Sequence, residues 1–299
     1  MAVVTSRLSL RALLLCVAAA APALGFAKPL PLWELEAGDN RVLLMGSVHF
    51  LRPGDYPLRP GIESAYELAD TIVMEIDLAS TDPVTTQATL AELSIDPEGR
   101  GLAALIGQSD YAEVARKATA LGIPELMFQQ VEPWFAALAI TQLRMLQLGF
   151  DPAWGVETRI GARAAADGKD TLGLETLAEQ LGFLDTLDPA TQEAFLMQSL
   201  DDAAQLQAEV ETIISAWRDG DAAALEQSLL DGLQEAPGLY EALLVRRNRN
   251  WVAPIRDLTR RRGNYLVIVG AMHLVGEDSV LAMLEEAGIK SRQLDDSDF

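Results

Sequence analysis

The pattern of apolar and polar residues divides the chain into strand-forming runs and longer helical stretches. Residues 31–47 predict two strands joined by a Gly-Asp-Asn turn, and 70–78 and 264–270 are apolar, β-branched runs typical of buried strands. The segment 156–175 continues as a helix, a glycine and a short strand. This alternation of helices and strands is typical of an α/β protein.

Helical spacing dominates the rest of the chain. Residues 59–69, 132–149 and 277–288 are predicted helices, and 290–295 is a candidate edge strand. Residues 184–262 are helical in pattern without an evident strand. We therefore predict one α/β domain over 28–299, with a mixed central sheet, flanking helices and a helical subdomain at about 184–245.

The first 27 residues have the pattern of a secretory signal peptide. Arg7 and Arg11 precede the apolar run 12–25, and small residues suited to cleavage follow. The run is too short and too rich in alanine for a convincing transmembrane helix. We expect a bacterial protein that is periplasmic or secreted, with no membrane span after cleavage.

The single cysteine, Cys16, lies inside the signal peptide, so the mature chain would contain no thiol. This excludes a cysteine nucleophile, a thiolate metal site and a disulfide scaffold. The net charge of −21 argues against nucleic acid or an anionic membrane surface as a partner.

The chain has two histidines, His49 and His273, and both lie in a Gly-x-x-His segment that directly follows a predicted strand. Strand ends are where α/β sheets place ligands and catalytic groups. A single histidine beside a strand is more often a hydrogen-bonded structural residue than a ligand. Two histidines in matching settings favour a shared functional site, because imidazole serves both as a metal ligand and as an acid–base group.

A carboxylate near these strand ends would complete a metal site, since catalytic zinc-type sites usually use three protein ligands. Glu75 and Asp77 alternate with Ile76 in the apolar run 70–78, which predicts that both project from one face of a strand. Buried carboxylates need a partner or a metal. Glu75 and Asp77 are therefore both candidates for the third ligand, and Glu75 is the more favoured of the two.

Five segments of the chain (43–50, 72–78, 155–180, 246–252 and 269–280) together resemble the TraB/PrgY/GumN family, which includes the Tiki proteins. The resemblance covers about residues 32–295 and is greatest to the exported bacterial GumN-like branch. It implies a fold similar to erythromycin-esterase-like and ChaN-like proteins. It also implies metal-dependent protease chemistry of the Tiki type.

The resemblance implies roles for particular residues. The two histidines of the Tiki proteins correspond to His49 and His273, and their glutamate corresponds to Glu75. The Arg/Asn position falls on Arg247 and Asn248, although the neighbouring arginines and Asn250 offer other registers. Read from the residues alone, an arginine run on a helix is usually a solvated or ion-paired face.

The leading hypothesis is an exported hydrolase that uses a divalent metal such as manganese, cobalt or zinc to cleave a peptide or protein substrate. Asp77 or Glu157 is the candidate general base, while Glu157 and Glu175 are otherwise expected to be structural. One alternative is a non-catalytic protein that binds a metal or haem. Another is an accessory factor in polysaccharide or envelope assembly. The sequence leaves the oligomeric state open.

Overall fold

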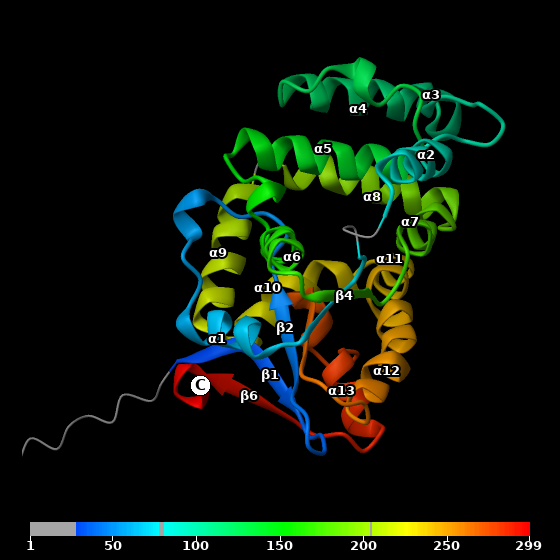
Figure 1. Cartoon of the computed structure of the whole chain (residues 1–299). Coiled ribbons are helices and arrows are strands. Elements are labelled where there is room, and N and C mark those ends of the chain that lie inside the picture. Colours follow the sequence, from blue (N-terminus) through cyan, green and yellow to red (C-terminus); the bar gives the residue numbers. More distant parts are fainter. Residues whose placement is uncertain (1–27, 78–80, 204) are drawn as a thin grey trace, which may run out of the picture.

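A computed structural model describes residues 28–77, 81–203 and 205–299 (Figure 1). The predicted signal peptide, 1–27, lies outside these residues. None of the helices in the described part of the chain combines the length and the apolar character that crossing a bilayer requires.

Six strands form one mixed sheet in the order β4-β3-β5-β2-β1-β6. Strands β4, β3, β5 and β2 are parallel to one another, whereas β1 is antiparallel to both β2 and β6. This confirms the predicted α/β class and the edge position of the last strand. The strands are β1 (Pro29–Leu35), β2 (Val42–Ser47), β3 (Thr71–Met74), β4 (Asp170–Gly173), β5 (Tyr265–Gly270) and β6 (Ser291–Asp295).

Helices pack on both faces of this sheet. The side chains of Leu43 and Met45 join α1, α6, α9 and α10 in one apolar cluster, whereas Val42 and Leu44 face the opposite cluster with α12 and α13. The central strands β2 and β5 are buried on both faces, which explains their continuous apolar runs. The helices around the sheet are α1 (Pro60–Leu68), α6 (Val156–Asp167), α9 (Leu206–Asp219), α10 (Ala222–Gln234), α12 (Arg246–Leu258) and α13 (Val280–Glu286).

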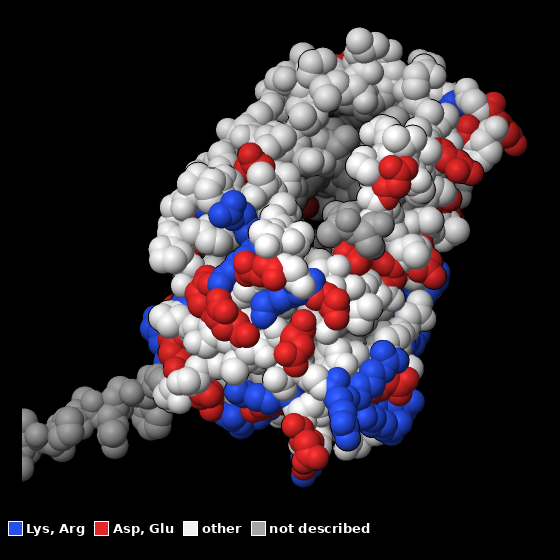
Figure 2. Space-filling model, viewed as in Figure 1, with Lys and Arg blue, Asp and Glu red and all other residues white. Residues whose placement is uncertain are grey.

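A second group of helices lies beyond the carboxyl ends of the parallel strands, in the upper part of Figure 1. The long helices α5 and α8 pack against each other, and α3 and α4 complete an apolar cluster with them. Figure 2 shows that the visible face is hollowed between this group and the sheet-bearing part. The group contains α2 (Pro83–Leu93), α3 (Leu102–Ile106), α4 (Gln108–Ala120), α5 (Pro133–Gln147), α7 (Leu177–Asp185), α8 (Pro189–Asp202) and α11 (Pro237–Tyr240).

The helices within 184–245 are divided between these two parts of the molecule. Helix α8 packs on α5, whereas α9 contacts β1 and contributes Trp217 to the apolar cluster beside the sheet. The Trp217 Nε1–H donates a hydrogen bond of 2.7 Å to the carbonyl of Gly46, close to the end of β2.

Candidate functional site

Four polar side chains follow four adjacent parallel strands. His49 comes after β2, His273 after β5, Glu75 after β3 and Glu175 after β4. Parallel strands end at the same edge of a sheet, so these side chains gather there in the strand order. The convergence of the two Gly-x-x-His segments, which the sequence suggested, therefore follows from the pairing of β2 with β5.

Gly270, the last residue of β5, is the point around which three of these side chains meet. A Cβ at this position would lie 3.3 Å from Oε1 of Glu75, 3.4 Å from Nε2 of His49 and 3.6 Å from Cδ2 of His273. The Gly270 N–H donates a 2.6 Å hydrogen bond to Glu75 Oε1. A glycine at this position thus permits a close approach that a larger residue would crowd.

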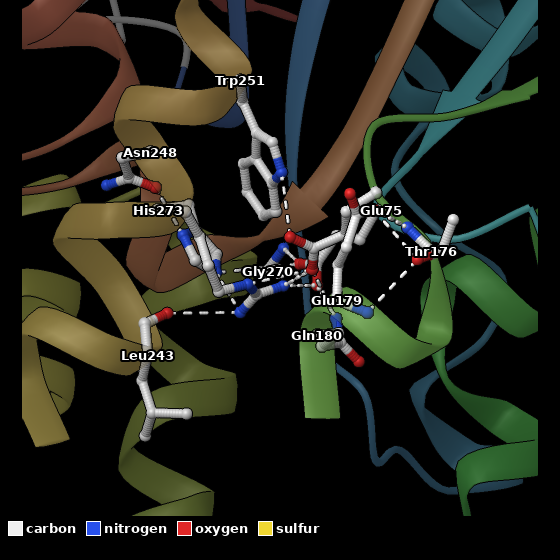
Figure 3. Close-up of polar contacts among 11 residues, drawn as sticks. Glu75, Thr176, Glu179, Gln180, Leu243, Asn248, Trp251, Gly270 and His273 are labelled. Carbon is white, nitrogen blue, oxygen red and sulfur yellow. Dashed lines mark hydrogen bonds and ion pairs between the residues drawn. The ribbon is translucent and has the colours of Figure 1, made fainter. Parts of the chain in front are cut away.

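Arg247 bridges two carboxylates of the site, Glu75 and Glu175. Its guanidinium donates to Glu75 Oε2 at 2.5 Å and to Glu175 Oε1 at 2.7 Å (Figure 3). It also donates to the carbonyl of Leu243, which lies in a π-helical turn, Glu241–Val245, directly before α12. Arg247 is 6% exposed, so this is a buried ion-pair network.

His273 is buried and held in one orientation by three neighbours. Its Nδ1 lies 2.6 Å from Asn248 Oδ1, an acceptor, so Nδ1 carries the proton and donates. Its Nε2 lies 3.1 Å from Nη1 of Arg247 and accepts from it. Its ring packs on Trp251, with centroids 4.5 Å apart. Burial is the main reason that the pKa of His273 falls to about 3, so this imidazole is neutral.

His49 has a different environment from that of His273. Its Nδ1 is hydrogen-bonded to Glu157 Oε1, and the negative charge of Glu157 is the largest cause that raises the pKa of His49 to about 9. Two local features position Glu157. The Val156 N–H donates to the carbonyl of Val48, and a Cβ on Gly155 would lie only 2.4 Å from the carbonyl oxygen of His49.

The carboxylates of the site differ in their charge preference. Burial alone would raise the pKa of Glu75, but Arg247 and the two histidines outweigh it and lower the pKa to about 2. Burial raises the pKa of Glu175. The Trp251 Nε1–H donates to Glu175 Oε2 at 3.2 Å, and Gln180 donates to both Glu75 and Glu175. Glu75 is therefore the carboxylate that this environment keeps ionised most strongly.

The predicted site residues occupy one network with one exception. His49, Glu75, His273, Arg247 and Asn248 all lie at the sheet edge described above. Asp77, a candidate base, lies elsewhere, and its carboxylate accepts a hydrogen bond of 2.9 Å from Thr171 on β4.

The expectation that Glu75 and Asp77 project from one face of a strand was wrong, because β3 ends at Met74. The chain bends at Glu75, so Glu75 and Asp77 are not alternating residues of one strand.

Sequence reasoning underestimated the carboxylates Glu157 and Glu175. It treated both as mainly structural, yet each contacts a member of the site, His49 and Arg247 respectively. The available signal was their position, since Glu175 follows a predicted strand and Glu157 opens a predicted helix. Sequence analysis also assigned no site role to Trp251, whose ring packs on His273.

A family model for the TraB/PrgY/gumN family matches residues 31–293. The chain belongs to this family. The chain is also similar to the uncharacterized protein YbaP of Escherichia coli strain K12 and to YbaP of Shigella flexneri. Each is 24% identical over 247 residues, covering 83% of this chain and 89% of the relative. No solved structure matches it significantly. The predicted family membership is thus confirmed, and the segments that suggested it contain the site residues of this member of the family.

Proposed function

We propose that this member of the family is an exported, metal-dependent hydrolase that cleaves peptide bonds, with His49, His273 and Glu75 as the metal-binding residues. The observation that carries the proposal is the convergence of the two imidazoles and the Glu75 carboxylate around Gly270. Two imidazoles and one carboxylate are a donor set that catalytic divalent metals use. Export implies a mature chain that starts near Lys28 in the periplasm or outside the cell.

The hydrogen bonds of both histidines suit metal binding. Metal-binding histidines usually donate their second ring N–H to a carboxylate or an amide oxygen, which fixes the ring and the tautomer. Glu157 and Asn248 are positioned to accept these hydrogen bonds from Nδ1 of His49 and Nδ1 of His273. The Nε2 atoms are then the donor atoms for a metal such as manganese, cobalt or zinc.

Arg247 limits how the metal could enter. Its Nη1 occupies the Nε2 side of His273, and the described His, Cys, Asp and Glu residues form no ready three-ligand cage. Metal binding at His273 therefore requires the Arg247 guanidinium to move away from Nε2. The two carboxylates that hold Arg247 allow it to stay charge-balanced near the site as it moves.

Each residue of the site would have a separate role in the proposed reaction. A bound metal would polarise the peptide carbonyl and acidify the attacking water. Arg247 supplies a positive charge beside the ligands, where it can stabilise an anionic oxygen of the substrate. Asn248 keeps the His273 tautomer fixed through Nδ1. Two carboxylates were considered as the general base. Glu157 lines a cavity that opens next to His49, whereas Asp77 is not among the residues that line this cavity.

Metal content of the chain from Lys28, measured by plasma mass spectrometry after loading and desalting, tests the proposal. We expect about one divalent ion per wild-type chain, and its loss in His49→Ala, His273→Ala and Glu75→Gln. Asp77→Asn is the matched control and should keep the metal. Metal-stimulated cleavage of a peptide library should disappear with the metal.

A metal-free hydrolase is the second candidate, and the contact between Arg247 and His273 Nε2 favours it. In that case His49, which Glu157 keeps protonated, would act as the general acid. Cleavage that persists in a chelator, is lost in His49→Ala and is retained in His273→Ala would replace the metal proposal with this one.

A further inference from the structure

A cavity of about 480 Å³ extends from the candidate site along the sheet face that carries α6. His49, Glu75 and Glu157 line it at the site. Its size lies within the range of about 300–1,000 Å³ that is usual for ligand sites. Since the site side chains line this cavity, a molecule that reaches them also meets its other walls.

Small residues on one face of α6 form one wall of the cavity. Gly161, Ala162 and Ala165 line it, and Ala165 follows the other two by four and three residues, the spacings of neighbours on one side of a helix. Glu157 and Thr158 lie one turn earlier on this side, next to His49. Beyond Thr158 the α6 residues that line the cavity are only glycine and alanine, which leaves space.

The facing wall is apolar and comes from the sheet. Met74 ends β3, Ile268 lies within β5, and Ile76 follows β3. A Cβ on Gly161 would lie 3.4 Å from Sδ of Met74, so α6 and β3 are already in close contact at this position. The cavity therefore has a polar end at the site and apolar walls elsewhere.

The charges at the polar end select against acidic groups. Glu75 and Glu157 line the cavity, and none of the described residues that line it is a lysine or an arginine. His49 also lines it, but its imidazole is already paired with Glu157, and Arg247 is bound by Glu75 and Glu175. An acidic side chain in the cavity would therefore lose its hydration without gaining an unpaired positive partner.

We propose that this cavity, between α6 and the ends of β3 and β5, binds an uncharged apolar side chain of the substrate next to the bond that the site acts on. The identity of that bond rests on the proposed function, whereas the preference for the side chain rests on the cavity alone. Substrates would therefore carry a residue such as leucine or methionine beside the reacting group.

Calorimetric binding of blocked tripeptides, acetyl-Ala-X-Ala-amide, to the metal-free chain tests this assignment. With X as leucine we expect binding at least about ten-fold tighter than with X as aspartate or lysine, as apolar pockets of this kind discriminate. Ala162→Leu and Ala165→Leu fill the wall of the cavity and should remove this preference. Ala166→Leu makes the same change at an exposed position of α6 that is not among the lining residues, and should leave it intact.

The outcomes separate the two proposals. Equal binding of the leucine and aspartate peptides overturns the assignment of the cavity whatever the activity. The assignment also fails if Ala166→Leu weakens binding as much as Ala165→Leu does. Leucine preference without metal or cleavage supports the cavity and rejects the proposed hydrolase.

Discussion

The two Gly-x-x-His segments end neighbouring strands, yet they place their histidines in opposite environments. The His49 side chain is 54% exposed, whereas that of His273 is 2% exposed. Glu157 favours the protonated form of His49, and burial beside Arg247 favours the neutral form of His273. The same local sequence pattern thus gives a positively charged imidazole on one strand and a neutral one on the next.

The difference follows from what packs over each strand end. Helix α12 covers His273 with Arg247, Asn248 and Trp251, whereas α6 approaches His49 from the side and leaves the ring facing the cavity. The half of the site around His273 is therefore buried, whereas the half around His49 faces the cavity.

Removing the ion pairs of Arg247 in the buried half should have the largest effect on the free energy of unfolding. Arg247→Ala would leave Glu75 and Glu175 without their cation, and losing one partner of a buried ion pair typically costs about 3–5 kcal/mol. Urea unfolding measures this change. Arg249→Ala, on the same helix, removes an exposed pair with Glu241 and should cost only about 0–1 kcal/mol. Equal losses in both variants would contradict the contrast.

The second largest effect should be the loss of stability at low pH that the buried His273 causes. The pKa of His273 is about 3 when folded, against 6.5 ordinarily, so only the unfolded chain takes up this proton between these values. The contribution of His273 to stability is complete above pH 6.5. It is lost as the pH falls, by about 1.4 kcal/mol per pH unit. Unfolding of wild type and His273→Gln from pH 7 to 4 isolates this effect, and parallel curves would rule it out.

Replacing Asn248, which accepts the hydrogen bond of His273, should have an intermediate effect on stability. Asn248→Leu removes the acceptor of the buried His273 Nδ1–H and the donor to the partly buried carbonyl of Asp278. Leaving such groups unpaired costs about 1–3 kcal/mol. Asn250→Leu, at an exposed position of the same helix, provides the control in thermal unfolding and should be nearly neutral.

A change in the exposed half should alter the pKa of His49 more than it alters the stability of the protein. Glu157→Gln removes the charge that raises the pKa of His49 to about 9, so this pKa should fall towards 6.5. Any stability from this pair is present below pH 6.5 and is lost as the pH rises towards 9. Histidine NMR of the metal-free chain measures both rings, since the chain has two histidines. A His49 signal that titrates near 6.5 in wild type would refute the pairing.

Much of the fold and half of the site could be predicted from the sequence. Apolar runs located β2, β3 and β5, and the rule that parallel strands end at one edge brought His49, Glu75 and His273 together. The burial of Arg247 could also have been predicted. Trp251, Ile255 and Leu258 form an apolar stripe on one face of the helix, and this face includes positions 247 and 248.

Other features depended on packing that the sequence does not display. The pairing of Glu157 with His49 needs Gly155 to contact the His49 backbone, an approach between residues about a hundred positions apart. Asp77 was misplaced because the bend after Met74 has no strong turn residue to mark it. Periodicity locates strands better than it locates their last residue.

The position of β5 has a consequence for biosynthesis. This strand lies between β3 and β2 in the sheet, but the ribosome adds its residues, 265–270, after those of β1, β2, β3 and β4. Until then these four strands can pair only as two separate ribbons, β1 with β2 and β3 with β4, because no strand joins them. Such long-range pairing delays formation of the sheet until β5 has been made. A polypeptide with this topology therefore gains its site and a continuous sheet in the same step.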